Sequence, residues 1–204
     1  EVGALCYLRG PLVIGANTKL SPHCSIGTEG EHRSRGPVGI IRIGNNTILR
    51  DCVVVQRGTG DRDTTIGDRC YIMSHGYVAH DGVIDDDVTL SPSVTLAGHT
   101  HVHRGATIGM GAMTHQFSTV GAYAMVGMGS VVTRSVPDFH LVIGNPARSV
   151  GCVCRCGEPL LKWDDVGGDE VLQKRCGVCG WEFEIEGREV MELIGEQREQ
   201  FARG

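Results

Sequence analysis

The segment YVAHDGVIDDDVTL, Tyr77 to Leu90, places a histidine directly before an aspartate, at His80 and Asp81. Histidine is the usual general base at physiological pH, and a carboxylate beside it can hold the imidazole in one tautomer and stabilise its charged form. Neither side chain helps a strand to bury an apolar face. The pair therefore predicts proton-transfer chemistry, with a solvated polar corner as the alternative.

A second set of reactive side chains occurs in VCRCG (153–157) and CGVCG (176–180), two cysteine pairs about twenty residues apart, each followed by glycine. Four thiolates suit tetrahedral zinc, and a closed site of four thiolates is structural rather than catalytic. We expect the ligands to be Cys154, Cys156, Cys176 and Cys179 of a zinc ribbon. Cys152 in place of Cys154 is one alternative, and reduced cysteines without metal are the other.

The elements that carry these residues follow from a repeat of six. Aliphatic residues recur at this interval, with one threonine among them, and the residues four places later are all small or the size of valine. The repeating positions are Ile66, Ile72, Val78, Ile84, Leu90, Leu96, Val102, Ile108, Thr114, Val120, Val126 and Val132. Residues 28–42 and a one-residue slip near 56–65 interrupt the phase. Neither a helix nor a plain strand has this period, whereas hexapeptide repeats form parallel β-helices.

Three hexapeptides make one triangular coil, so residues 18 apart should stack on neighbouring coils, about 4.8 Å apart. One such column contains His80, Gly98 and Gln116, and the next contains Asp81, His99 and Phe117. Glycine lets a substrate approach the backbone N–H, as an oxyanion donor requires. A base and an oxyanion donor without an obvious nucleophile predict direct attack of an activated acceptor on an acyl group.

The same repeat explains the scattered cysteines. Cys6, Cys24 and Cys70 fall on the small inner position of the coil, so we expect them to pack in the core rather than to react.

The chain therefore divides into a β-helix over residues 1–148 and a ribbon tail over residues 149–204. In the tail, EFEIE (182–186) alternates as a strand does. Residues 189–201 are expected to form a short helix, whose apolar side would carry Val190, Leu193, Ile194 and Phe201.

Composition limits the function. Residues 1–150 carry twelve basic and twelve acidic side chains, and residues 151–204 carry seven and twelve, which accounts for the net charge of −5. This distribution gives no basic footprint for nucleic acid. No apolar run is long enough for a membrane span, and no secretory signal opens the chain. The chain begins with Glu1 rather than Met, so further residues are expected before it. The nine cysteines are expected to be reduced and the protein cytoplasmic.

Several motifs together resemble one family. AHD (79–81), TLAGH (95–99), THQF (114–117), VGMGS (126–130) and IGNPA (143–147) are similar to motifs of the UDP-N-acetylglucosamine acyltransferases that begin lipid A synthesis, in the same order and at close to the same spacing. The resemblance covers roughly residues 10–148. It implies a left-handed parallel β-helix and a homotrimer with active sites between subunits.

The resemblance also implies roles for individual residues. His80 matches the general base, Asp81 the residue that orients it, and Gly98 the backbone donor to the thioester carbonyl. Met128 falls where the family tunes acyl length, which favours a short or medium acyl group, although plain groove packing is an equal alternative. Contacts to the sugar nucleotide or within the active site are expected from His99, His115 and Gln116.

Three departures from the family pattern bear on substrates. Tyr77 stands where the family has a second histidine, and TEGEHRSRG (28–36) replaces its sugar-binding loop. Arg33 and Arg35 of this segment are expected to meet a diphosphate, with simple solvation as the alternative. The chain also lacks the family's basic helical ending, and its acidic tail should repel acyl carrier protein, which favours coenzyme A. Some nucleotide-sugar N-acetyltransferases have a similar ribbon after GNPAR, which points to an amine acceptor.

We therefore expect an acyltransferase that moves an acyl group from coenzyme A or acyl carrier protein to a hydroxyl or amine of a nucleotide-linked sugar. A non-catalytic trimeric scaffold with the same fold is the main alternative. A carbonic anhydrase type of metalloenzyme is a third, but it needs three histidines around one zinc, and His75 and His80 fall in different columns.

Overall fold

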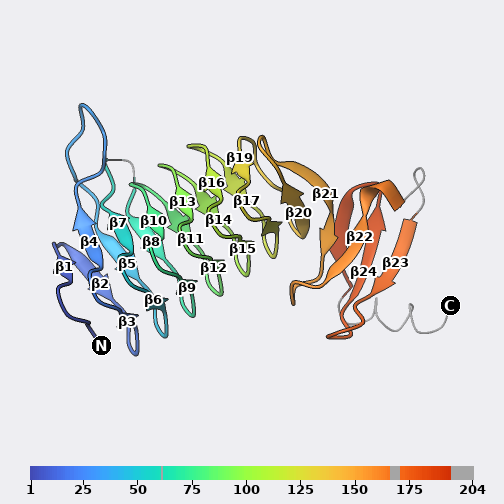
Figure 1. Ribbon diagram of the computed structural model, residues 1–204, viewed down its shortest axis with the longest axis horizontal. Helices are drawn as coiled ribbons and strands as arrows, with labels where there is room; N and C mark the ends of the chain where they lie inside the picture. Colours follow the sequence, from blue (N-terminus) through green and yellow to red (C-terminus); the bar gives the residue numbers. More distant parts are fainter. Residues whose placement is uncertain (61, 166–170, 194–204) are drawn as a thin grey trace.

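The computed structural model describes residues 1–60, 62–165 and 171–193. Short strands and turns wind into stacked coils that run from one end of the molecule to the other, and a small antiparallel unit follows the last coil (Figure 1). Three sheets form the faces of this β-helix, and strands within each face pair in parallel with an offset of one coil.

The first face contains β1 (Tyr7–Leu8), β4 (Ser25–Thr28), β7 (Val54–Gln56), β10 (Tyr77–Val78), β13 (Thr95–Leu96), β16 (Met113–Thr114) and β19 (Val131–Val132). The second face contains β2 (Leu12–Ile14), β5 (Ile41–Ile43), β8 (Thr64–Ile66), β11 (Val83–Ile84), β14 (His101–Val102) and β17 (Thr119–Val120). The third face contains β3 (Lys19–Leu20), β6 (Ile48–Leu49), β9 (Tyr71–Ile72), β12 (Thr89–Leu90), β15 (Thr107–Ile108) and β18 (Met125–Val126).

The third face continues into the tail through β20 (His140–Ile143), β21 (Arg148–Val153) and β22 (Pro159–Lys162). β20 still pairs in parallel with β18, whereas β21 pairs with β20, and β22 with β21, in antiparallel fashion. A short 3-10 helix follows (Trp163–Asp165), and a separate antiparallel sheet contains β23 (Val171–Arg175), β24 (Glu182–Glu186) and β25 (Glu189–Glu192).

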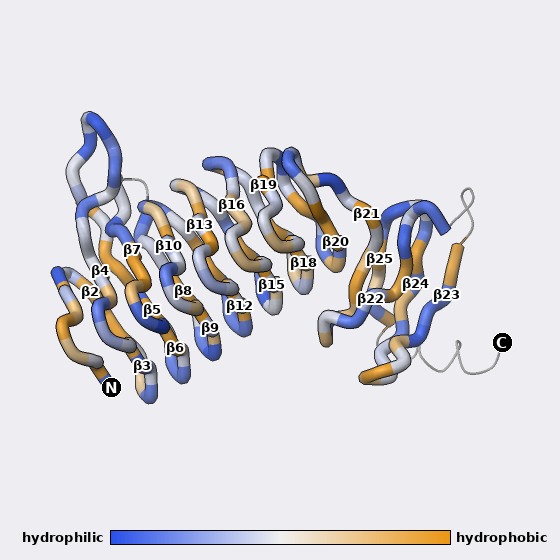
Figure 2. Tube along the Cα trace, in the orientation of Figure 1, coloured by the Kyte–Doolittle hydropathy of each residue, from blue (hydrophilic) through white to orange (hydrophobic). Residues whose placement is uncertain are grey.

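The predicted interior positions are the core. All twelve members of the six-residue series from Ile66 to Val132 are buried, Thr114 included. The Oγ1 atom of Thr114 accepts a hydrogen bond from the Ala97 N–H and shares a second one with Thr100 Oγ1, so its polar atom is satisfied inside the coil. Cys24 and Cys70 are buried, and Cys6 packs partly buried against the same core. Figure 2 shows the apolar positions recurring along the strands.

In the turns between successive strands of the β-helix, one residue adopts the left-handed backbone conformation. This residue recurs every sixth position from Arg69 to Gly129, with φ between 56° and 68°. Asp81 and His99 occupy such positions, with φ of 58° and 60°. Non-glycine residues rarely adopt this conformation, so the corner geometry of the coil, rather than local preference, fixes where these two side chains project.

Two coils are longer than 18 residues. Tyr77 pairs with Thr95, an offset of 18, but Ser25 pairs with Val54, an offset of 29, and Val54 with Tyr77, an offset of 23. The additional residues lie between β4 and β5 and between β7 and β8. These are the corners two coils and one coil before the corner that carries His80. The segment between β4 and β5 projects beyond the stack (Figure 1). The apparent one-residue slip in the sequence is therefore a five-residue insertion.

The tail differs from the prediction in one element. β24 coincides with the predicted strand 182–186, but Glu189–Glu192 form β25 rather than the first turn of a helix. Val190 pairs with Ile185 of β24 and packs among the buried residues of the tail, so its apolar side chain is used by the sheet. The helix prediction is wrong for this segment, and its remainder, residues 194–201, lies outside the described residues.

Candidate active site and cysteine cluster

The His80 imidazole lies at the corner between β10 and β11 and contacts the carboxylate of its neighbour. Its Nδ1 is 2.8 Å from Asp81 Oδ2. The Asp81 side chain is fully buried, whereas 13% of the His80 side chain is exposed. One end of the pair is therefore closed off from water, and the other remains accessible.

Thr59 secures the buried carboxylate. Its backbone N–H donates to both Asp81 oxygens at 3.3 and 3.1 Å, and its Oγ1 donates to Oδ2 at 2.8 Å. Burial alone would raise the pKa of Asp81, but the hydrogen bonds from His80 and Thr59 outweigh it, and the pKa is lowered. An ionised carboxylate only accepts hydrogen bonds, so the Nδ1 of His80 must carry the proton and donate it. In the neutral imidazole, Nε2 then keeps its lone pair, as a general base requires.

Gly98 lies under the His80 ring in the next coil. A Cβ atom at this position would lie 2.7 Å from His80 Cε1 and 2.9 Å from Nε2, so no larger residue fits without displacing the ring. Within the described part of the chain, the Gly98 N–H donates no hydrogen bond, although its carbonyl accepts one from Phe117 N–H. The residue that packs against the imidazole therefore has a backbone N–H without a partner in the described structure.

His99 extends the cluster into the second column. Its Nε2 is 3.7 Å from Asp81 Oδ2, and its ring meets that of His80 edge to face with centroids 5.3 Å apart. Phe117, one coil further, stacks on His99 at 4.5 Å and is itself 66% exposed. The predicted 18-residue columns are therefore real, and the second one ends in an exposed aromatic surface.

The segment 28–36 covers the other side of His80. A Cβ at Gly30 would lie 2.8 Å from His80 Cβ, and the His32 ring meets that of His80 edge to face at 6.0 Å. The Glu31 carboxylate accepts a hydrogen bond from the Tyr77 hydroxyl at 3.1 Å. Burial and the nearby Glu31 charge raise the pKa of Tyr77, so its hydroxyl stays protonated as a donor.

The other predicted substrate residues are exposed and less constrained. His115 and Gln116 lie at the corner one coil beyond Gly98, where His115 Nδ1 bonds to the Gln116 carbonyl. Met128 is 78% exposed at a different corner. Arg33 and Arg35 lie on the exposed part of the projecting segment, beyond the two residues that meet His80.

Sequence reasoning missed Thr59, Glu31 and His32. All three belong to the two insertions, where the 18-residue spacing fails and stacking cannot be calculated. One signal in the sequence could have indicated them. Both interruptions of the period come before the AHD corner, and inserted residues must leave the coil at a corner, so they could be expected near His80.

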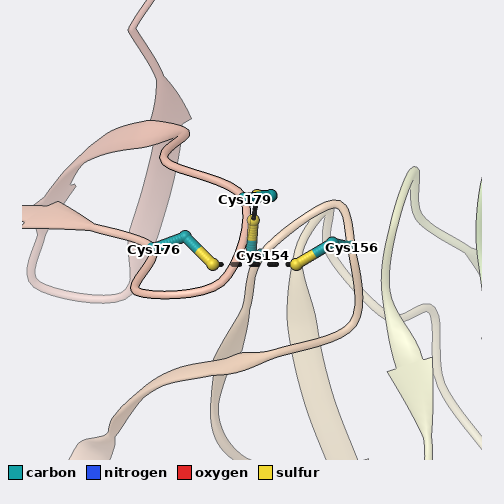
Figure 3. A group of neighbouring side chains, drawn as sticks. All are labelled: Cys154, Cys156, Cys176 and Cys179. Carbon is teal, nitrogen blue, oxygen red and sulfur yellow. Dashed lines mark hydrogen bonds between the residues drawn. The ribbon is translucent and has the colours of Figure 1, made fainter.

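The four predicted cysteines form one cluster, whose Sγ atoms all lie within 4.8 Å of one another (Figure 3). Cys154 Sγ is 3.3 Å from Cys179 Sγ, and Cys156 Sγ is 3.6 Å from Cys176 Sγ. Tetrahedral zinc with Zn–S bonds of about 2.3 Å places sulfurs roughly 3.8 Å apart, so the donor set fits that ion. The backbone N–H of Cys179 lowers the pKa of Cys176 to about 6, which favours a thiolate.

Cys152 is not part of this cluster. Its side chain is buried, and it packs with Trp163 and Ile185 in the interior of the tail. Burial raises the pKa of its thiol to about 11, as expected for an unreactive core cysteine. The geometry therefore favours Cys154 over Cys152 as the fourth member of the cysteine cluster.

Comparison with known proteins identifies relatives of the β-helix. No protein-family model matches the chain. It is 37% identical over 143 residues to an acyl-(acyl-carrier-protein)–UDP-N-acetylglucosamine O-acyltransferase of Gloeothece citriformis, covering 69% of this chain and 52% of that protein. The Synechocystis protein of the same name is 38% identical with the same coverage. The chain thus spans about half the length of these curated relatives.

Solved structures agree in fold. The UDP-N-acetylglucosamine O-acyltransferase of Moraxella catarrhalis matches with a TM-score of 0.62 and 32% identity, over 74% of this chain and 62% of that one. A perosamine N-acetyltransferase variant of Caulobacter crescentus, solved with coenzyme A and GDP-perosamine, matches with a TM-score of 0.55 and 29% identity, over 66% and 56%. The predicted left-handed parallel β-helix and the resemblance to UDP-N-acetylglucosamine acyltransferases are confirmed.

Proposed function

We propose that this chain is an acyltransferase that moves an acyl group from a thioester to a hydroxyl or amine of a nucleotide-linked sugar. One observation carries the proposal. In the neutral His80 tautomer that Asp81 sets, Nε2 keeps its lone pair. The ring packs against Gly98, whose backbone N–H has no acceptor in the described structure. A base and an oxyanion donor on one corner are the two groups that direct acyl transfer requires.

In the proposed reaction, His80 Nε2 takes a proton from the acceptor hydroxyl or amine as that atom attacks the thioester carbonyl. The carbonyl oxygen becomes an oxyanion and accepts a hydrogen bond from Gly98 N–H. The C–S bond then breaks, and the imidazolium returns its proton to the departing thiolate. Asp81 stabilises the imidazolium between these two proton transfers.

The relatives supply the substrate class. Their names and bound ligands point to UDP- or GDP-linked sugars as acceptors, and to acyl carrier protein or coenzyme A as donor. His99, His115 and Gln116 are proposed to contact the acceptor, and Arg33 and Arg35 its diphosphate. Met128 is proposed to limit the acyl group to short or medium length. The acidic tail favours coenzyme A over the acidic carrier protein.

We further propose one structural zinc ion, held by Cys154, Cys156, Cys176 and Cys179. The ion would tie the turn after β21 to the turn after β23 and would supply no step of the reaction. The chain is proposed to work as a catalytic β-helix, residues 1–148, with a ribbon tail, residues 149–204. β21 (Arg148–Val153) crosses this division and joins the two parts.

A homotrimer is proposed from the likeness to the acyltransferases, and a cytoplasmic location from nine cysteines that form no disulfide. Within the described ranges, no helix has the length and apolar character needed to cross a membrane.

The deciding experiment measures release of free thiol. The protein would be incubated with acyl-coenzyme A and acyl-carrier thioesters of graded chain length, together with UDP-N-acetylglucosamine or its 3-amino analogue. We expect release only when donor and sugar are both present, and the productive pair identifies the donor and the attacking atom. Absence of release from a folded, metal-loaded protein with every pair would contradict the proposal and favour the non-catalytic scaffold.

A further inference from the structure

Two histidines of β14 project from the second face of the β-helix. Val102 is buried, so its neighbours His101 and His103 point outward from the same side of the chain. β11 and β14 are adjacent (Figure 1), and Ile84 pairs with Val102. This register places Asp85, the residue after β11, beside His103.

The three side chains converge on one point. His101 Nε2 lies 2.8 Å from Asp85 Oδ1, and His103 Nδ1 lies 3.3 Å from Asp85 Oδ2. The two imidazole centroids are 3.9 Å apart, and one ligand atom from each residue lies within 4.8 Å of the others. Between 29% and 38% of each side chain is exposed, so an ion from solution can reach all three.

The arginines near the site pair with the neighbouring aspartates and not with Asp85. The adjacent Asp86 and Asp87 pair with arginines, Asp86 with Arg69 and Asp87 with Arg69 and Arg104. In the described structure, the Asp85 carboxylate contacts only the two imidazoles. Partly exposed pairs of this kind contribute little to stability, so the fold alone does not account for two histidines sharing one carboxylate.

We propose that Asp85, His101 and His103 bind one divalent first-row transition-metal ion, with zinc as the reference ion. Zinc binds imidazole nitrogen at about 2.0–2.1 Å and carboxylate oxygen at about 2.0–2.2 Å, so ligand atoms around it lie roughly 3.4 Å apart, close to the spacing seen here. Three protein ligands leave a fourth position for water. A shallow groove of about 550 Å³ is lined in part by Asp85, so this ligand borders solvent-accessible space.

The site is separate from the cysteine cluster and from the His80 corner, and the inference does not depend on the proposed reaction. Its donor set also differs from a three-histidine centre. Cysteine thiolates and the imidazole–carboxylate set both accept zinc, so total zinc content must be compared between variants rather than read from one protein.

The test is zinc content per chain, measured by mass spectrometry on untagged protein after dialysis against buffered, low-micromolar free zinc. The double variant His101→Ala and His103→Ala should bind one zinc per chain fewer than the wild type. The control replaces two exposed histidines at other corners, His23→Asn and His75→Asn, because asparagine tolerates their left-handed backbone. The control should keep the wild-type zinc content.

Asp85→Asn is the second variant, since it keeps the shape of the side chain and removes its charge. It should also lose the one zinc. Thermal unfolding followed by circular dichroism separates loss of the site from loss of the fold. Equal zinc in the wild type and in either folded site variant would overturn the proposal, whatever the cysteines bind.

Discussion

At the scale of single residues, His80 depends on two groups that do not come from its own coil. Thr59, from the insertion after β7, fixes the carboxylate that orients the ring. Gly98, from the following coil, leaves space for the ring because it has no side chain, and its N–H is unpaired in the described structure. The ring itself is only one part of a corner that three successive coils build.

Replacing His80 with alanine tests its assigned role. His80→Ala should lower kcat by about 10²–10⁴-fold, because that is the usual contribution of a positioned general base. Thiol release would be measured with saturating sugar, and thermal unfolding would show that the fold is intact. The exposed His23→Asn variant is the control and should retain full activity. Near-normal turnover of His80→Ala would remove His80 from the mechanism.

Asp81 should make folding stability depend on pH in the acidic range. Its pKa in the folded protein is lowered from the unfolded value of about 3.9, so the unfolded chain binds the proton more readily. The stability contributed by the ionised carboxylate is present above about pH 4 and is lost as pH falls through the lowered folded value.

The measurement for Asp81 is Tm of the wild type and of Asp81→Asn from about pH 6 to pH 3. The gap between the two proteins should be widest at the upper end and should shrink on acidification. Asp51→Asn, at a half-exposed carboxylate, is the control and should produce no such change in the gap. A gap that stays constant with pH would show that Asp81 is not preferentially ionised in the folded state.

At the scale of elements, the joint between β-helix and ribbon relies on one buried histidine in β20. Trp163 Nε1 donates to Ser149 Oγ at 2.7 Å, Ser149 donates to His140 Nδ1 at 2.8 Å, and His140 Nε2 donates to the Arg188 carbonyl at 2.8 Å. This arrangement of donors fits the neutral imidazole; in the charged form Nδ1 would also donate, and the Ser149 hydroxyl would have to turn to accept from it. Burial accordingly lowers the pKa of His140.

The joint should therefore weaken in mild acid. Stability contributed by neutral His140 is complete above the unfolded pKa of about 6.5 and declines as pH falls below it, because the unfolded chain then takes up a proton that the folded chain resists. Tm should fall more steeply between about pH 7.5 and 5.5 in the wild type than in His140→Asn. His23→Asn should keep the wild-type slope, and equal slopes for His140→Asn and wild type would contradict the assignment.

The elements also show how far the sequence determines this structure. The twelve-member core series, the columns through His80 and Asp81, the strand 182–186 and the grouping of the four cysteines could all be predicted, because each follows from a fixed local spacing. Thr59 could not, since the inserted segment that holds it obeys no period. The network of His140, Ser149 and Trp163 could not either, because it joins residues that only the folding of the tail brings together.

The error at residues 189–192 has a related cause. Val190 and Leu193 are three residues apart, a spacing that a helix and a short strand with its following turn both permit. The pairing of Val190 with Ile185 decides between them, and that is a contact between strands rather than a property of either segment.

At the scale of the whole molecule, the four cysteines bring together the turns after β21 and β23, and the proposed zinc would join these two turns. Removing the proposed zinc with a chelator should unfold the ribbon while the β-helix stays folded, since the β-helix has its own continuous core. When the chelated protein is heated, the fluorescence of Trp163 and Trp181, both in the ribbon, should change at a lower temperature than the far-ultraviolet circular dichroism of the β-helix. Cys176→Ser should behave like the chelated protein.

Cys152→Ala is the matched control for that variant, because it removes a buried thiol outside the cluster. It should keep the zinc content and the unfolding behaviour of the metal-loaded wild type. Loss of zinc from Cys152→Ala, or unchanged tryptophan fluorescence after chelation, would show that the cysteine cluster does not organise the ribbon as proposed.

Neighbouring strands of a face belong to successive coils. The distance from His80 to the ribbon can therefore change only by whole coils. Deleting 18 residues between β11 and β18 would bring the two about 4.8 Å closer and leave each remaining column in register. Deleting six would instead move every later strand to the next face. Evolution can therefore alter the length of this molecule only in discrete steps, whereas the corners, as the insertions after β4 and β7 show, accept added residues in any number that returns the chain to the stack.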